Sequence, residues 1–131
     1  MKQFGELLQS ADWKTEKHVP VIDCQDTVKA GESFAVKVAV GKEIAHPNTT
    51  EHHIRWIAVY FLPEGAKFAA EAGRFEFCAH GESVDGPNKG VVYTDHAVTA
   101  SMKVNASGTV YAISLCNIHG LWQSAKDIRI T

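Results

Sequence analysis

The chain has 131 residues, of which 45% are hydrophobic and 21% are charged, and its formal net charge is -2. These values are ordinary for a globular protein, so we expect residues 1–131 to form a single domain without a general basic surface for nucleic acid. Residues 1–19 contain no long apolar run, so we expect neither a signal peptide nor a membrane span, and a cytoplasmic location.

The first half of the chain predicts one short helix followed by strands. Residues 1–12 look helical, with a short apolar stripe formed by Phe4, Leu7 and Leu8. In residues 33–40, SFAVKVAV, every second side chain from position 34 is apolar, which is typical of a strand with one buried face. Residues 53–63 are rich in β-branched and aromatic residues and end at a proline, and they predict a second strand.

The second half continues with strands. Residues 67–80 could begin as a helix, but Gly73 and the following RFEF alternation favour a strand. Residues 86–90, GPNKG, predict a turn. Further strands are expected at residues 96–104, 109–116 and 127–131. Six or seven short strands separated by turns predict an all-β sandwich or barrel.

Histidine and cysteine are the unusual part of the composition. Seven histidines are many for a chain of this length. The three cysteines are an odd number and include no CxxC pair, which excludes a disulfide scaffold and a rubredoxin-like site with four cysteines.

Three short segments carry candidate metal ligands. They are EKH with His18, HPNTTEHH with His46 and His52, and CNIHG with Cys116 and His119. Imidazole and thiolate are common ligands of borderline transition metals, and a CxxH spacing lets both reach one ion from a tight turn. Each segment alone is weak evidence, but their presence together at the ends of predicted strands indicates a metal site.

The remaining candidates are interpreted as structural residues. A lone histidine is usually solvated or satisfied in the core, and we expect this of His53, His80 and His96. Cys24 and Cys78 are expected to be small core residues. The tryptophans, Trp13, Trp56 and Trp122, are also expected in the core, although Trp122 is close enough in sequence to His119 to shield a metal site.

Spacing alone leaves the metal open. One cysteine and three histidines would suit zinc in a structural site. A sandwich with CxxH before its last strand also suits a cupredoxin, in which two histidines and one cysteine hold copper. The axial methionine of a cupredoxin is missing after His119, where only Gln123 could take its place, and a copper site leaves EKH unexplained.

Four segments in this order closely resemble superoxide reductase of the one-iron type, also called neelaredoxin. They are EKHVP, HPNTTEHHI, GRFEFCAHGESV with GPN shortly after it, and CNIHGLW. The resemblance extends from about Asp12 to the end of the chain. The additional N-terminal domain with four cysteines, which two-iron members carry, is not found in this sequence.

The resemblance implies an immunoglobulin-like β-sandwich or barrel of about seven strands, assembled as a homotetramer. It also implies one mononuclear non-haem iron per chain. Four equatorial imidazoles would come from His18, His46, His52 and His119, and an axial thiolate from Cys116. Glu16 would occupy the sixth position in the oxidised state, and Lys17 would lie beside the open position.

The activity implied by the resemblance is the one-electron reduction of superoxide to hydrogen peroxide, with a rubredoxin-like electron donor. Lys17 would attract the anion and order a proton-donating water, and Glu16 would be displaced and would help peroxide to leave. Backbone N–H groups of residues 117–119 would donate hydrogen bonds to the Cys116 sulfur. The alternatives are a copper electron carrier, a structural metal site in a binding module, and a superoxide dismutase, which needs no outside electron.

Overall fold

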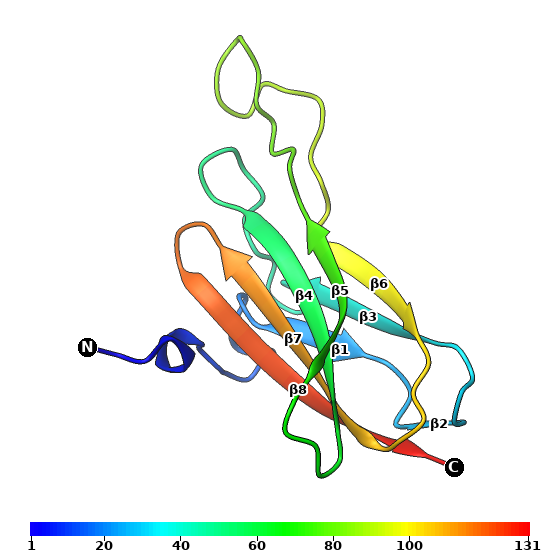
Figure 1. Ribbon diagram of the computed structural model, residues 1–131. Coiled ribbons are helices and arrows are strands. Elements are labelled where there is room, and N and C mark those ends of the chain that lie inside the picture. The colour runs from blue at the N-terminus through cyan, green and yellow to red at the C-terminus, as the bar shows by residue number, and fades with distance from the viewer.

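Two β-sheets form the body of the computed structural model, which describes residues 1–131 (Figure 1). The elements in chain order are a 3-10 helix η1 (Phe4–Leu7) and the strands β1 (Pro20–Asp23), β2 (Thr27–Val28), β3 (Phe34–Val40), β4 (Ile54–Pro63), β5 (Ala70–Glu76), β6 (Ala97–Met102), β7 (Gly108–Cys116) and β8 (Gly120–Ile130). No helix of the chain is both long and apolar enough to cross a lipid bilayer.

The two sheets face each other as the layers of a sandwich. One has three strands in the order β1-β3-β6, and the other has five in the order β2-β8-β7-β4-β5. All pairings are antiparallel except that of β2 with β8. The prediction of an all-β sandwich is confirmed.

The core fills the space between the sheets. Alternate residues of β3 are buried from Phe34 to Val40, and alternate residues of β7 are buried from Val110 to Cys116. Both strands therefore show the period of two that arises when one face of a strand packs inward. Each sheet has one apolar face, and the two sheets pack against each other because this buries both faces.

Several predicted elements differ in extent. The N-terminal helix is a single turn with no buried residue, rather than a helix over residues 1–12. The last strand begins at Gly120, whereas it was predicted to begin at residue 127. The prediction missed its first half because polar residues there interrupt the apolar alternation. Strands β1 and β2 were not predicted, since both are very short. Cys78 is exposed, so its prediction as a core residue is wrong.

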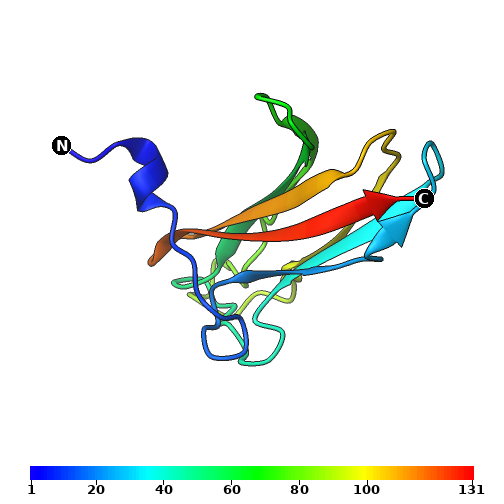
Figure 2. The same cartoon turned by 90° about the horizontal axis from the view of Figure 1, so that it is seen from below.

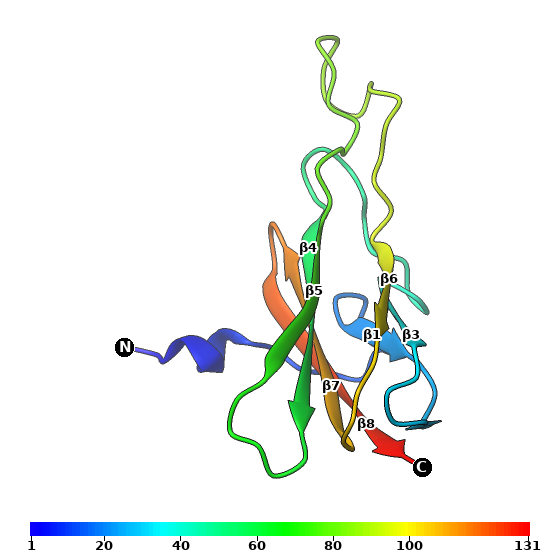
Figure 3. The same cartoon turned by 45° about the vertical axis from the view of Figure 1, so that its right-hand side comes forward.

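Loops that carry the candidate ligands meet at one end of the sandwich. Figure 2 shows the segment before β1 lying beside the connection between β3 and β4. The turn between β7 and β8 belongs to the same end of the five-stranded sheet (Figure 1). Residues 77–96, between β5 and β6, project beyond both sheets, and the N-terminal segment leaves the sandwich sideways (Figure 3).

Candidate metal centre

Three separate segments deliver the predicted ligands. His18 lies just before β1, His46 and His52 lie between β3 and β4, and Cys116 ends β7. Cys116 points into the sandwich and is 1% exposed, as the alternation of β7 requires. The chain then turns tightly to bring His119 back, and Gly120 has a φ of +82°, which favours glycine.

Nitrogen and sulfur atoms of four of these residues converge. His119 Nδ1 is 3.1 Å from His18 Nε2, 3.2 Å from His52 Nε2 and 3.8 Å from Cys116 Sγ. All four ligand atoms lie within 4.8 Å of one another. A neutral imidazole has only one proton, so one nitrogen cannot donate hydrogen bonds to all three neighbours. Lone pairs that face one another at these distances fit a shared cation.

His46 lies beside the cluster but is not among the four residues whose ligand atoms lie within 4.8 Å of one another. The centroid of its ring lies 4.9 Å from those of His18 and of His52. Its Nδ1–H donates a 2.6 Å hydrogen bond to the Pro47 carbonyl, while its buried Nε2 has no hydrogen-bond partner. A buried polar atom without a partner is costly, and a metal ion at the cluster would satisfy this one.

A carboxylate fixes the tautomer of His18. Nδ1–H of His18 donates a 2.6 Å hydrogen bond to Glu16 Oε1, which leaves Nε2 free to face the other ligand atoms. The same hydrogen bond is the main reason that the pKa of Glu16 is lowered. Trp122 stacks on the opposite side of the imidazole, with ring centroids 5.0 Å apart. Trp122 is buried, so the expectation that it shields the site agrees with its position.

Burial favours the neutral form of two of the imidazoles. Burial lowers the pKa of His46 to about 4. Burial also lowers the pKa of His52, followed by the nearby charges of His119, His18 and Lys17. Metals bind the neutral form of histidine, so burial prepares both rings as ligands.

The sulfur atom of Cys116 accepts a hydrogen bond of its own. The backbone N–H of His119 donates to Cys116 Sγ at 3.3 Å, as expected, whereas the N–H of Asn117, for which the same was expected, donates to the His53 carbonyl instead. A donor at this place reduces the electron density on the sulfur and so tunes a metal bound to it.

Lys17, which stands between Glu16 and His18 in the sequence, is half-buried. Its positive charge contributes to lowering the pKa of His52.

The other histidines lie outside the cluster. His53 and His80 are buried and stack on each other, with ring centroids 3.4 Å apart and planes at 9°. His96 is half-buried, and its ring centroid is 5.8 Å from that of His46. None belongs to the group of converging ligand atoms, in agreement with the structural role expected for them.

Two residues that contact the ligand segments were not singled out in the sequence. Asn117 joins the turn after β7 to the segment of His52 and His53 by three hydrogen bonds. Gln9 donates its side-chain N–H to the His119 carbonyl at 2.9 Å. Asn117 stands inside CNIH and could have been suspected, whereas nothing in the sequence relates Gln9 to residue 119.

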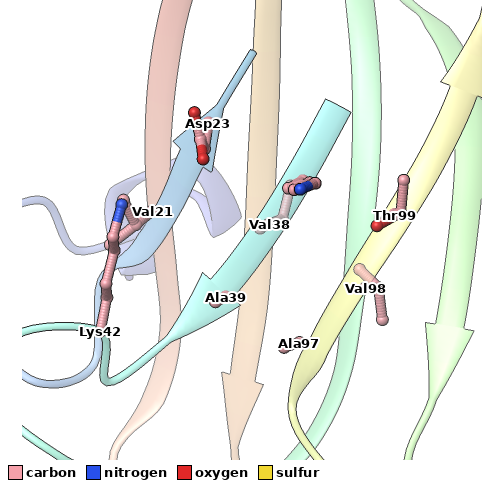
Figure 4. A pocket seen from close by; sticks show the side chains of 9 residues that line it. Val21, Asp23, Val38, Ala39, Lys42, Ala97, Val98 and Thr99 are labelled. Atoms are coloured by element: carbon pink, nitrogen blue, oxygen red, sulfur yellow. The ribbon is translucent and has the colours of Figure 1, made fainter. Parts of the chain in front are cut away.

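A hollow on the outer side of the three-stranded sheet differs from the histidine–cysteine cluster in the side chains that line it. It is shown in Figure 4 and is lined by Val21, Asp23, Lys37, Val38, Ala39, Lys42, Ala97, Val98 and Thr99. It contains no histidine or cysteine and is mainly apolar, so it offers no second set of soft metal ligands.

Comparison with known proteins places the chain in a family. The model of the desulfoferrodoxin family matches residues 10–125. Neelaredoxin from Megalodesulfovibrio gigas is 60% identical over 125 residues, which cover 95% of this chain and 96% of that protein. Superoxide reductase from Pyrococcus furiosus is 57% identical over 121 residues, or 92% of this chain and 95% of that one.

Solved structures agree with this assignment. The reduced form of superoxide reductase (neelaredoxin) from Archaeoglobus fulgidus superposes with a TM-score of 0.87 at 55% identity, and the match covers 94% of this chain and 98% of that chain. The fold, the sequence match and the histidine–cysteine cluster are thus consistent with one another. The chain belongs to the desulfoferrodoxin family.

Proposed function

We propose that the chain is a non-haem iron superoxide reductase, which converts superoxide, one electron and two protons into hydrogen peroxide. The observation that carries this proposal is the convergence of three imidazole nitrogens and one thiol within 4.8 Å, in a chain of the desulfoferrodoxin family. The orphaned Nε2 of His46 beside them adds a fourth imidazole.

The proposed ligand set is His18, His46, His52, His119 and Cys116. Five donors exceed the four of a closed structural zinc site, and imidazoles with one thiolate suit iron. Bound ferrous iron would supply the electron and an open position for a small anion. A cupredoxin-type copper site would need an axial methionine. Met102 cannot supply it, because it pairs with Phe34 at the end of β3 opposite to the ligand loop, so the copper alternative is weaker.

Glu16 and Lys17 are proposed to act on the substrate and on the oxidised site. Glu16 accepts a hydrogen bond from Nδ1–H of His18, so its side chain would have to turn to reach the sixth position at a bound iron. Lys17 carries a positive charge beside His52, where it would attract superoxide and hold a water that supplies a proton. Both residues directly precede His18 in the chain, which keeps their backbone close to this proposed ligand.

A small redox protein of the rubredoxin type is our proposal for the electron donor. Ile118 lies between two proposed ligands and its side chain is 59% exposed, while His119 is also exposed. An apolar side chain at the surface next to the metal ligands offers a short route into the site and a contact for a partner.

Assembly and location are further parts of the proposal. We propose a homotetramer, which is supported by exposed apolar residues on the projecting segments, among them Phe4, Val84 and Val91. We propose a cytoplasmic location because all three cysteines are free thiols. Residues 1–131 are proposed to act as one domain.

The test is a balance of products on the iron-loaded, pre-reduced protein. A reductase forms one hydrogen peroxide per superoxide and no oxygen, whereas a dismutase releases oxygen and forms half as much peroxide. Cys116→Ser should abolish the reaction even when iron binds, and Cys78→Ser, which changes an exposed thiol, should preserve it. Oxygen release without an electron donor, or a copper hyperfine pattern in the paramagnetic resonance spectrum of the purified protein, would contradict the proposal.

A further inference from the structure

The turn that carries Cys116 and the loop that carries His52 belong to different parts of the chain, and one side chain joins them. We propose that Asn117 is a positioning residue that holds His52 in place relative to Cys116, an inference that rests on the proposed iron site. Asn117 is not itself one of the proposed ligands, and its effect is exerted through the two that it connects.

Three hydrogen bonds of Asn117 enclose His52. The backbone N–H of Asn117 donates to the His53 carbonyl at 3.1 Å, and the His53 N–H donates to Asn117 Oδ1 at 2.9 Å. The side-chain Nδ2–H donates to the Glu51 carbonyl at 2.9 Å. The residues immediately before and after His52 are therefore both tied to the residue that follows Cys116.

The sheet alone does not provide this connection. The ladder between β4 and β7 ends at the pair Ile54 and Cys116, and it is irregular between Ile54 and Trp56. Beyond that pair, one backbone hydrogen bond, from Asn117 N–H to the His53 carbonyl, joins residues 51–53 to the turn, and the side chain of Asn117 adds the other two. The amide side chain of Asn117 has both a donor and an acceptor, so it can extend the pairing where the strands separate.

Other contacts of the His52 loop lead elsewhere. Thr49 and His52 bond to each other, which closes the loop on itself. Asn88 contacts Thr50 and Glu51, which ties the loop to the projecting segment between β5 and β6. Among the side chains of the turn after β7, Asn117 is the one that hydrogen-bonds the backbone on both sides of His52. Its loss should therefore free His52 to move relative to Cys116 while the loop keeps its own shape.

The experiment compares Asn117→Ala with Asn117→Asp and with Thr109→Val. Thr109→Val removes a side-chain hydrogen bond to Asp127 at the opposite end of β7, so it is the matched control for general stability. Asn117→Ala should weaken ferrous iron binding about tenfold or more in a chelator competition, the effect usual for residues that orient ligands. The control should bind iron as the unsubstituted protein does.

Two further readouts separate positioning from stability. The resonance spectrum of oxidised Asn117→Ala should change its line shape because His52 shifts, and Asn117→Asp, which keeps the acceptor for the His53 N–H, should stay closer to the original. In the metal-free protein, Asn117→Ala should also speed hydrogen exchange of the His53 amide. This last measurement needs no iron, so it tests the role of Asn117 even if the proposed reductase activity fails.

The inference is overturned if iron affinity, line shape and His53 exchange in Asn117→Ala equal those of Thr109→Val. If Asn117→Ala does not fold, Asn117→Asp decides: it has lost the donor to Glu51, so an unchanged iron affinity would overturn the inference as well. An unsubstituted protein that binds no iron would contradict the proposed function, whereas the exchange result would still stand.

Discussion

At the scale of single residues, Glu16 combines two properties that can be separated by mutation. Its Oε1 accepts the Nδ1–H of His18, so it determines which nitrogen of that ring faces the cluster. Its negatively charged carboxylate is also the group that we propose for the sixth position at a bound iron. Glutamine keeps an acceptor oxygen but has no charge, and alanine has neither.

Glu16→Ala should weaken iron binding about tenfold, because His18 loses the partner that orients it, and Glu16→Gln should weaken it much less. Both variants should change the absorption spectrum of the oxidised protein and leave the initial rate with superoxide nearly unchanged. Chelator competition and rapid mixing check these outcomes, with Glu43→Ala, an exposed carboxylate between β3 and β4, as the control. Equal iron affinities for the alanine and glutamine variants would rule out the orienting role.

Lys17 is predicted to affect the rate of encounter with superoxide. Lys17→Ala should slow the second-order reaction by ~10-fold at low ionic strength and flatten its dependence on salt, since one attracting charge is removed. Rapid mixing over a series of salt concentrations measures both effects. Lys14→Ala, an exposed lysine next to Trp13, is the matched control. A salt dependence that is the same in both variants would remove the steering role of Lys17.

At the scale of elements, the loop between β3 and β4 depends on how it leaves β3. Gly41 directly follows β3 and has a φ of +79°, and a Cβ placed there would lie 2.5 Å from the backbone nitrogen of His46. That neighbour is backbone, so it cannot turn away as a flexible side chain could. Close approach at Gly41 thus helps to fix the place of His46.

Gly41→Ala should destabilise the protein and also weaken iron binding, because His46 must move. Gly65→Ala is the control: Gly65 has a similar φ of +77° but nothing within 4 Å of the new Cβ, so only the backbone strain of about 1–2 kcal/mol is expected. Denaturant unfolding gives the stability and chelator competition the iron affinity. If both alanine variants bind iron alike, contact with His46 does not control the site.

The elements also show where sequence reasoning works. Strands with one buried face, such as β3 and β7, have clear alternation and were predicted nearly to their ends. The first half of β8 was missed because Gln123 and Ser124 break the apolar pattern, although backbone pairing with β7 holds both residues in the strand. The candidate ligands were proposed from three short motifs, and the structure brings four of them together. Contacts such as Gln9 with His119 were not, since residues 110 positions apart share no local signal.

At the scale of the whole molecule, buried histidines connect folding to pH. His46, His80 and His96 each have a lowered pKa, and burial is the main cause in every case. The unfolded chain takes up protons on these rings below about pH 6.5, while the folded protein does not until lower pH. The contribution of these histidines to the unfolding free energy of the metal-free protein should therefore be complete above about pH 6.5. It should decrease as the pH falls towards their pKa values in the folded protein, and the value for His46 is about 4.

His80 allows this effect to be measured away from the proposed ligands. It is 3% exposed, stacks on His53 and faces Glu82, which partly opposes the lowering of its pKa. His80→Phe keeps an aromatic ring for the stack but cannot titrate. Each proton bound only by the unfolded chain changes the unfolding free energy by about 1.4 kcal/mol per pH unit. The variant should therefore show a shallower loss of stability as the pH falls below about 6.5, by up to that amount per unit.

Denaturant unfolding of the metal-free protein at a series of pH values gives the two slopes. The phenylalanine variant changes one buried imidazole, so the contribution of His46 remains in both proteins and cancels in the comparison, whereas those of Glu82 and His96, whose pKa values His80 lowers, change with it. Two parallel curves would mean that His80 takes up its proton equally in the folded and unfolded chains, contrary to its burial. A steeper curve for the variant would mean that the folded protein favours protonated His80, with Glu82 outweighing burial and the neighbouring His53.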